Sequence, residues 1–308
     1  MNTTKTRLNE KYFQIKNNCC IVTVASKEYY HQLIALIVSI KKVFIEHPKI
    51  YIFDLGLKNY QKKELEGIYN ICLREIPEFI SHWKSCYTWK PYILLNVPED
   101  TVLYLDAGNV ALNDFKNIFL SINKNNYFLA AQGIKNNLIT PIEYLDLVSI
   151  DYDMFLNSYT FASSLIGFKK NTKFYQGLKK VFDLSCQGYT LGYSKIEFHR
   201  IKNNHENIIR DCHLFRHDMT LLNLCIWESL NNRVKIHKGE KYVGWIRDKQ
   251  ASHQIFYNHR NDVFFIKKHL IKNISKNLIY FFINRFLFLT AFIKILVKKY
   301  LKKYFNEN

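Results

Sequence analysis

Apolar and polar positions along this chain alternate in blocks that predict strands followed by helices. Short apolar runs, typical of strands buried on both faces, occupy residues 19–26, 50–53, 101–105 and 161–170. Apolar residues at helical spacing occupy 29–44 and 219–227, a polar helix is predicted over 59–69, and a short helix over 85–95. The strand, turn and helix at the start of this series are typical of a nucleotide-binding α/β fold.

The strand at 101–105 ends abruptly on Asp106, which is followed by Ala107, Gly108 and Asn109. In open α/β sheets, ligands bind beyond the carboxyl ends of the strands, so Asp106 is a candidate site residue. A simpler interpretation is that Asp106 caps a turn, as Asp before Gly often does.

The segment from Ser85 to Asn109 resembles the centre of a GT-A-type glycosyltransferase. In that family, a helix with Lys or Arg, here Lys90, precedes a strand that ends in a DXD-type motif. Asp106 occupies the first acidic position, while Gly108 replaces the second Asp. The chain is also loosely similar to glycosyltransferase family 8 and related bacterial polysaccharide glycosyltransferases. The resemblance implies an α/β GT-A-like Rossmann-type mixed sheet flanked by helices, over residues 15–265.

The resemblance also implies where a nucleotide-sugar donor binds. The nucleotide pocket would be lined by Thr23, Ala25, Ser26 and Asp54. The donor diphosphate or sugar would contact Lys90, Asp106, Ala107, Gly108 and Arg260. Arg260 could hold phosphate through its fork of donors. Asp54 has an alternative role, as the cap of the turn before Gly56.

A divalent cation, Mn²⁺ or Mg²⁺, is the cofactor that such a site uses to offset the charge of the diphosphate. These cations prefer oxygen ligands and need few from the protein. Candidate ligands are Asp106, Asn109, His237 and His259. Two departures from the family pattern leave metal use open. Gly108 replaces the second Asp of the DXD motif, and Gly239 follows His237 one residue sooner than the Gly of the family 8 motif His-x-x-Gly-x-Lys.

Residues of two later segments are candidates for the acceptor side. Ser163 and Ser164 belong to a strand whose small side chains would let a sugar approach the backbone. His217 and Asp218 stand where a charged cluster opens the helix before 227, like the His-Asp-Gln segment of GT-A proteins. Asp218 would contact the acceptor hydroxyl, and act as general base if the enzyme inverts configuration. Alternatively, Asp218 only stabilises the positive end of the helix dipole.

The chain has 308 residues and a net charge of +18, and half of this charge lies in residues 267–308, with ten basic residues and one acidic. Apolar runs at 278–283 and 286–293 are each too short to cross a bilayer. We therefore expect residues 266–308 to form a basic amphipathic helical tail that lies on an anionic membrane surface. Packing of this tail on its own domain or on a second copy is the alternative.

Seven cysteines without CxxC spacing favour reduced thiols, and the N-terminus lacks the order of a secretory signal. The GT-A resemblance implies a glycosyltransferase, and with the basic tail and these features we expect it to be peripheral on the inner, cytoplasmic face of the cytoplasmic membrane. Its acceptor would be a lipid-linked saccharide or a surface polysaccharide such as lipopolysaccharide or capsule. A non-catalytic nucleotide-sugar-binding or scaffold protein is the alternative. A nucleic-acid partner is not expected, because no zinc finger or RNP-like motif accompanies the basic charge.

Overall fold

The computed structural model describes residue 12 and residues 16–192, 214–243 and 254–258, all within one compact unit, Met1–Arg260. The predicted tail at 266–308 and the candidate site residues His259 and Arg260 lie outside the described residues. So does the predicted boundary at 265, and these hypotheses stay predictions.

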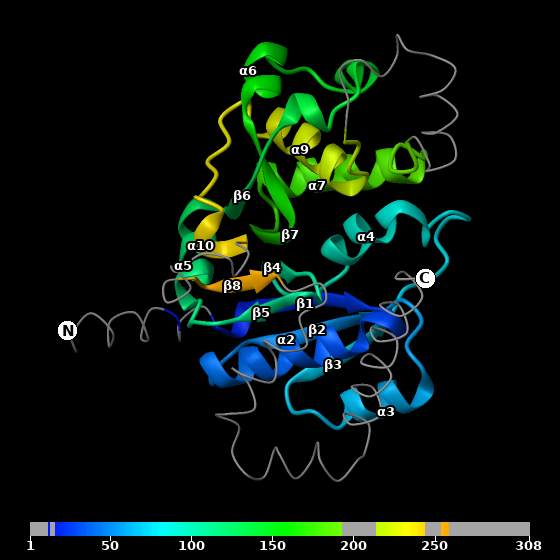
Figure 1. Cartoon of the computed structure of the whole chain (residues 1–308), viewed down its shortest axis with the longest axis vertical. Helices are drawn as coiled ribbons and strands as arrows, with labels where there is room; N and C mark the ends of the chain where they lie inside the picture. Colours follow the sequence, from blue (N-terminus) through cyan, green and yellow to red (C-terminus); the bar gives the residue numbers. More distant parts are fainter. Residues whose placement is uncertain (1–11, 13–15, 193–213, 244–253, 259–308) are drawn as a thin grey trace, which may run out of the picture. The chain divides into compact units, whose positions relative to one another are not determined.

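A six-stranded sheet forms the centre of this unit (Figure 1). Its strand order is β3-β2-β1-β4-β7-β6. The four parallel strands are β1 (Cys19–Ala25), β2 (Lys49–Asp54), β3 (Ile71–Glu75) and β4 (Thr101–Leu105). Strand β7 (Tyr159–Lys169) runs antiparallel to β4, and β6 (Tyr127–Lys135) runs antiparallel to β7. The predicted fold class, an α/β mixed sheet flanked by helices, is confirmed.

Helices cover both faces of this sheet (Figure 1). One face carries α2 (Tyr30–Val43), α3 (Asn59–Glu66) and α5 (Lys116–Asn125), and the other carries α4 (Trp89–Leu95), α7 (Lys173–Cys186) and α9 (Asp218–Ser229). Alternate residues of a strand point to opposite faces. In β1, Cys20 and Val22 therefore enter one core, while Cys19 and Ile21 enter the other. This double burial explains the uninterrupted apolar runs of the sequence.

Shorter elements connect this framework. They are the helices α6 (Tyr152–Asn157) and α10 (Glu240–Val243), the strands β5 (Asn109–Ala111) and β8 (Phe256–Asn258), and the 3₁₀ turns Lys16–Asn18, Lys27–Tyr29, Ser85–Tyr87, Asn136–Leu138 and Ile142–Leu147. Strands β5 and β8 pair antiparallel, with Asn109 opposite Asn258. This pairing brings a late segment of the chain to the turn that follows β4.

Two predicted helices are shorter than expected. The helix predicted over 59–69 ends at Glu66. The helix predicted over 85–95 begins only at Trp89, because Cys86 and Tyr87 have positive φ values of 49° and 62° and interrupt it. Within the described ranges, no helix combines the length and the apolar character needed to span a bilayer.

Candidate active site

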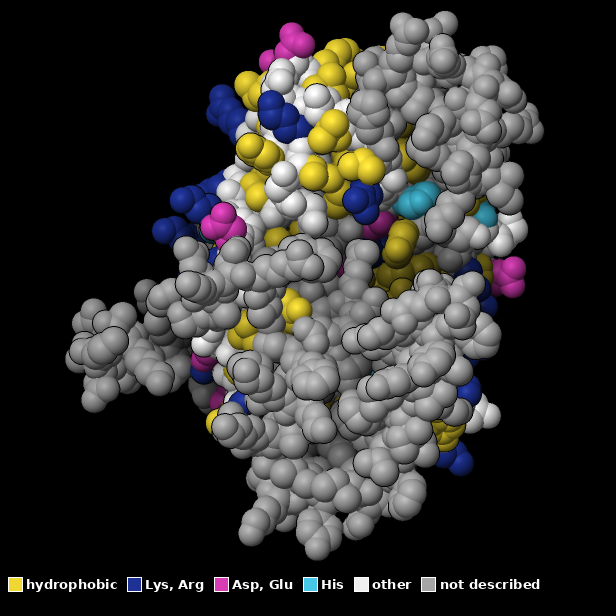
Figure 2. Space-filling model, viewed as in Figure 1, with side chains coloured by type: hydrophobic (Ala, Val, Ile, Leu, Met, Phe, Trp, Pro, Cys, Tyr) yellow, Lys and Arg dark blue, Asp and Glu magenta, His cyan; other side chains and the backbone are white. Residues whose placement is uncertain are grey.

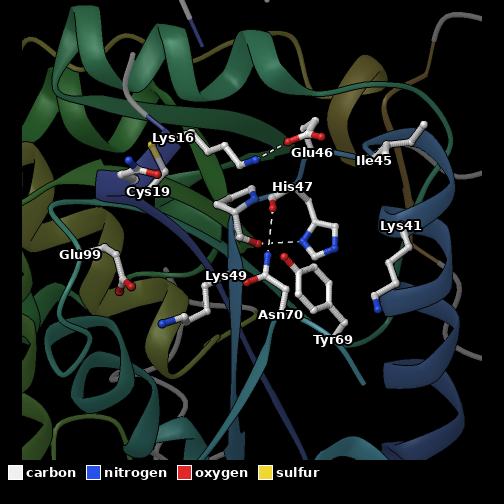
Figure 3. Close-up of a pocket in the computed structure, with 12 residues that line it drawn as sticks. Lys16, Cys19, Lys41, Ile45, Glu46, His47, Lys49, Tyr69, Asn70 and Glu99 are labelled. Carbon is white, nitrogen blue, oxygen red and sulfur yellow. Dashed lines mark hydrogen bonds and ion pairs between the residues drawn. The ribbon is translucent and has the colours of Figure 1, made fainter. Parts of the chain in front are cut away.

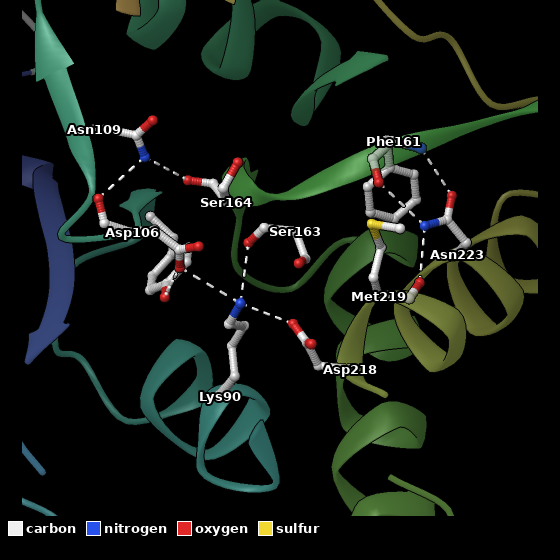
Figure 4. Close-up of polar contacts among 10 residues, drawn as sticks. Lys90, Asp106, Asn109, Phe161, Ser163, Ser164, Asp218, Met219 and Asn223 are labelled. Carbon is white, nitrogen blue, oxygen red and sulfur yellow. Dashed lines mark hydrogen bonds and ion pairs between the residues drawn. The ribbon is translucent and has the colours of Figure 1, made fainter. Parts of the chain in front are cut away.

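The turn after β4 places Asp106 at the carboxyl edge of the parallel strands. Its backbone N–H donates to the Ser164 carbonyl across the β4–β7 pair, over 3.0 Å. The buried Asn109 side chain donates through Nδ2 to the carbonyls of Asp106 and Ser164, over 3.1 and 3.0 Å (Figure 4). The turn is thus tied to β7, and the Asp106 side chain remains about one-third exposed, at 35 %.

Lys90, from the first turn of α4, lies between this carboxylate and a second one. Its Nζ is 2.8 Å from Asp218 Oδ2 and 3.5 Å from Asp106 Oδ1, and it donates to the Ser163 carbonyl over 3.3 Å (Figure 4). Only 2 % of the Lys90 side chain is exposed. Helix α4, the β4 turn, β7 and the start of α9 therefore meet at one ammonium group.

The electrostatics of this cluster favour a charged lysine. Burial lowers the pKa of Lys90, but the charges of Asp106 and Asp218 more than offset it, so its pKa lies above the usual value. Tyr104 donates its hydroxyl to Asp106 Oδ1, and burial followed by the charge of Asp106 raises the Tyr104 pKa well above its usual value. The phenol therefore stays a hydrogen-bond donor to the carboxylate at neutral pH.

Lys90 has a different environment from the one expected for a diphosphate ligand. Its ammonium already has three oxygen neighbours and is almost fully buried. One of these contacts is a hydrogen bond and two are ion pairs, so the ammonium charge is already paired within the protein. The structure assigns Lys90 to the two carboxylates, and its direct contact with a diphosphate stays a prediction.

Helix α9 holds the predicted acceptor strand in place. Asn223 accepts from Phe161 N–H over 2.9 Å and donates to the Phe161 carbonyl over 3.2 Å, so its amide replaces a strand neighbour for β7. Ser163 and Ser164 follow two and three residues further along β7, both partly exposed beside Lys90 and Asp106. These two predicted acceptor residues and Asp106 thus lie in one cluster.

The start of α9 places Asp218 inside the protein, with 3 % exposure. The preceding residue, His217, adopts a φ of 50°, and its Nδ1 lies 2.9 Å from the Thr190 carbonyl. The predicted position of the His217–Asp218 pair at a helix N-terminus is confirmed. A dipole effect alone does not describe Asp218, because its carboxylate also pairs with Lys90.

Of the residues predicted to line the nucleotide pocket, two are buried within β1 and two are partly exposed at the ends of strands. Thr23 is fully buried within β1 and Ala25 is nearly so. Ser26 is partly exposed at the end of β1 and donates to Glu28 over 2.6 Å. Asp54 accepts from the N–H groups of Gly56 and Leu57, over 2.7 and 2.6 Å. These are the contacts of a turn cap, and a contact of Asp54 with a base or ribose stays a prediction.

The proposed metal ligands do not all lie together. The backbone of His237 pairs with β6 on the side away from β7, so three strand spacings separate it from β4. At about 4.8 Å for each spacing, this is a distance of roughly 14 Å. Its ring stacks on Phe128 at 4.5 Å, and burial, then Lys235 and Lys241, lower its pKa. Figure 4 shows Asn109 Oδ1 pointing away from the Asp106 carboxylate. Neither side chain is therefore placed to share a cation with Asp106.

Within the described ranges, no group of three or more His, Cys, Asp or Glu side chains is arranged to hold a metal ion. A single exposed carboxylate still fits Mg²⁺ or Mn²⁺ chemistry, because such cations often take one or two carboxylates plus substrate phosphates. Asp106 meets this condition. Strand β8 ends at Asn258, opposite Asn109, and the candidate ligand His259 lies outside the described residues.

An open pocket of about 590 Å³ lies elsewhere, at the opposite edge of the sheet, where β1 and β2 begin (Figure 3). Its lining includes Lys41, His47, Lys49 and Tyr69, and none of the predicted site residues. Lys16 and Glu46 form an ion pair across it. Because ligands of α/β sheets bind at the carboxyl ends of the strands, the candidate active site is the Asp106 cluster and not this pocket.

Four residues that shape the site were not predicted from the sequence, namely Tyr87, Tyr104, Thr190 and Asn223. Tyr104 could have been found from the sequence, because side chains two positions apart on a strand point to the same side. Tyr104 lies two positions before Asp106 and therefore shares its side of the strand. Thr190 and Asn223 act through contacts with distant backbone groups, which no local pattern indicates.

Fold and site together define a mixed α/β protein with two carboxylates and a buried lysine at the carboxyl edge of its parallel strands. Among solved structures, the chain is similar to an active-site mutant of LgtC and to galactosyltransferase LgtC in complex with donor and acceptor sugar analogs. Each match has a TM-score of 0.43 and 12 % identity, and covers 79 % of this chain and 87 % of the other. No family model and no curated protein matches the sequence.

Proposed function

We propose that this protein is a glycosyltransferase that moves a sugar from a nucleotide-sugar donor to a saccharide acceptor. The observation that supports this most is the Lys90 cluster, in which one buried ammonium holds Asp106 and Asp218 at the carboxyl edge of the sheet. Asp106 is the residue expected at the donor, and Asp218 the one expected at the acceptor. A transferase needs both substrates side by side, and this arrangement provides neighbouring carboxylates for them.

In the inverting form of the reaction, Asp218 takes the proton of the acceptor hydroxyl. The acceptor oxygen then forms a bond to the anomeric carbon while the bond from that carbon to the diphosphate oxygen breaks. Lys90 orients both carboxylates and offsets their mutual repulsion. If the configuration is retained, Asp218 instead binds and orients the acceptor.

A divalent cation, Mn²⁺ or Mg²⁺, is part of this proposal through Asp106. When bound, it would neutralise charge on the donor diphosphate and so assist its departure. Asp106, kept in position by Tyr104 and the β4 turn, would hold it. His259 stays a proposed ligand, and His237 does not lie near Asp106.

The natural acceptor in this proposal is a lipid-linked saccharide or a growing surface polysaccharide at the cytoplasmic membrane face. The support is the charge of residues 267–308, where ten basic residues flank apolar runs. Removal of these residues should abolish binding to vesicles that contain anionic phospholipid. Unchanged vesicle binding would refute this anchor.

The first experiment is a thermal-shift series with UDP-, GDP-, CMP- and ADP-sugars, each with and without Mn²⁺, because ligands that bind the native state raise the melting temperature. One donor class should stabilise the protein and support transfer to a saccharide. Asp106→Asn should reduce transfer by about 100-fold or more, as removal of a key electrostatic group does.

The matched control is Asp114→Asn, which removes an exposed carboxylate paired with Lys116 and should keep full activity. Wild-type turnover by Asp106→Asn would overturn the assignment. Donor binding without turnover would instead favour the scaffold hypothesis, which Gly108 in place of the second Asp makes the main alternative. Tight, salt-sensitive binding of oligonucleotides without donor binding would favour a nucleic-acid-binding protein.

A further inference from the structure

Tyr87 lies beside the Lys90 cluster on an unusual backbone. Cys86 and Tyr87 are consecutive residues with φ values of 49° and 62°. These values lie in the left-handed region, which residues other than glycine rarely adopt. Across the site, His217 has a φ of 50°. Strained positions such as these persist where the surrounding structure enforces them, and they concentrate at ligand sites.

One loop residue, Thr190, holds both strained segments. Thr88 Oγ1 lies 2.6 Å from Thr190 Oγ1, and His217 Nδ1 lies 2.9 Å from the Thr190 carbonyl. As a result, the rings of Tyr87 and His217 lie with their centroids 6.2 Å apart, inclined at 43°. The two rings form an angled aromatic wall.

The Tyr87 ring of this wall is exposed to solvent and also lies close to the charged ammonium group of Lys90. The Tyr87 side chain is 48 % exposed although Lys90 Nζ lies 5.3 Å from its ring centroid. Burial, followed by the charge of Asp218, raises the Tyr87 pKa. The Tyr87 ring also lies beside the ring of His217, which directly precedes Asp218. Figure 2 shows acidic and histidine side chains among hydrophobic ones in the middle of the face viewed.

We propose that Tyr87 and His217 wall a carbohydrate subsite in which the acceptor's sugar ring packs its C–H face against the Tyr87 ring. This proposal rests on the proposed function and names the residues that position the acceptor. The face of an aromatic ring is electron-rich, so it attracts the polarised C–H groups of a pyranose. A sugar in this position would lie next to His217, the residue that precedes Asp218.

The test compares Tyr87→Leu, which keeps apolar volume, with Tyr87→Phe, which keeps the ring. Saturation-transfer NMR with a panel of methyl glycopyranosides reports sugar binding without any donor. Tyr87→Leu should lose the transfer signal and raise the acceptor KM by about tenfold, while Tyr87→Phe stays close to wild type. Tyr60→Ala, at a tyrosine of similar exposure on α3, is the control and should change neither quantity.

An acceptor KM within twofold of wild type in Tyr87→Leu would overturn the proposal, and so would a rise confined to the donor KM, which would assign the ring to the nucleotide. A nucleotide-sugar thermal shift of wild-type size in Tyr87→Leu shows that the variant is folded. The absence of a donor shift in the wild type would contradict the proposed function. Saturation transfer that depends on Tyr87 would then still support the subsite.

Discussion

Lys90 Nζ and Asp218 Oδ2 lie 2.8 Å apart, although α4 and α9 carry them in distant parts of the sequence. Both side chains are almost fully removed from solvent, with exposures of 2 % and 5 %. A buried ion pair of this kind contributes less net stability than its distance suggests, because both charges lose their hydration. Breaking it is costly, because the remaining charge is left without a partner.

Lys90→Met should therefore destabilise the protein by about 3–5 kcal/mol, since Asp106 and Asp218 would be left facing each other without their shared cation. Chemical denaturation measures this change. The matched control is Lys180→Met, which breaks the more exposed Lys180–Glu228 pair between α7 and α9 and should cost about 1 kcal/mol or less. Equal losses in the two variants would contradict the special role of Lys90.

Asn223→Ala should loosen the acceptor strand from α9. The substitution leaves the buried N–H and carbonyl of Phe161 without these partners, at a cost of about 1–3 kcal/mol. Transferase activity should fall more than stability implies, because Ser163 and Ser164 lie two and three residues further along β7 than Phe161. The comparison is Asn96→Ala, which removes an exposed hydrogen bond to Tyr92. A neutral Asn223→Ala would mean that β7 keeps its position without α9.

Gly239→Ala should disturb the segment that pairs with β6. A Cβ at this position would lie 1.9 Å from the Ala131 carbonyl oxygen, which belongs to the backbone and has little room to move. We expect a loss of about 1–3 kcal/mol, as for other overpacked sites. In Gly67→Ala the nearest atom to the new Cβ is 3.7 Å away, so that variant should melt close to wild type. Thermal unfolding of both variants measures the difference.

His47 should make stability pH-dependent below about pH 6.5, the usual histidine pKa. Burial lowers its pKa in the folded state, and its Nδ1 lies 2.8 Å from the Pro48 carbonyl. The unfolded chain therefore binds this proton more readily, so stability is fully present above pH 6.5 and falls as the pH decreases. His47→Gln should flatten the dependence of the free energy of unfolding between pH 5 and 7. The pKa of His31 shifts in the same direction, so part of the slope should remain.

Several elements could be predicted from local sequence because their pattern of apolar residues reflects how they are buried in the structure. The runs at 19–26 and 101–105 are apolar at every position since β1 and β4 are covered on both faces. The helix of residues 219–227 was predicted for the same reason, and it is buried along nearly its whole length. Strand β6 was not predicted, because its second half is partly exposed and its register against β7 is irregular.

By itself, the sequence determined the α/β class, the end of β4 just before Asp106 and the position of the His217–Asp218 pair at the start of α9, since each depends on the period and the termini of a single element. Only the tertiary structure decided that Lys90 faces both carboxylates, that Asn223 holds β7, and that Tyr87 and His217 share Thr190. These contacts join segments far apart in the chain. Their geometry depends on strand order and helix packing, which hydrophobic periodicity does not encode.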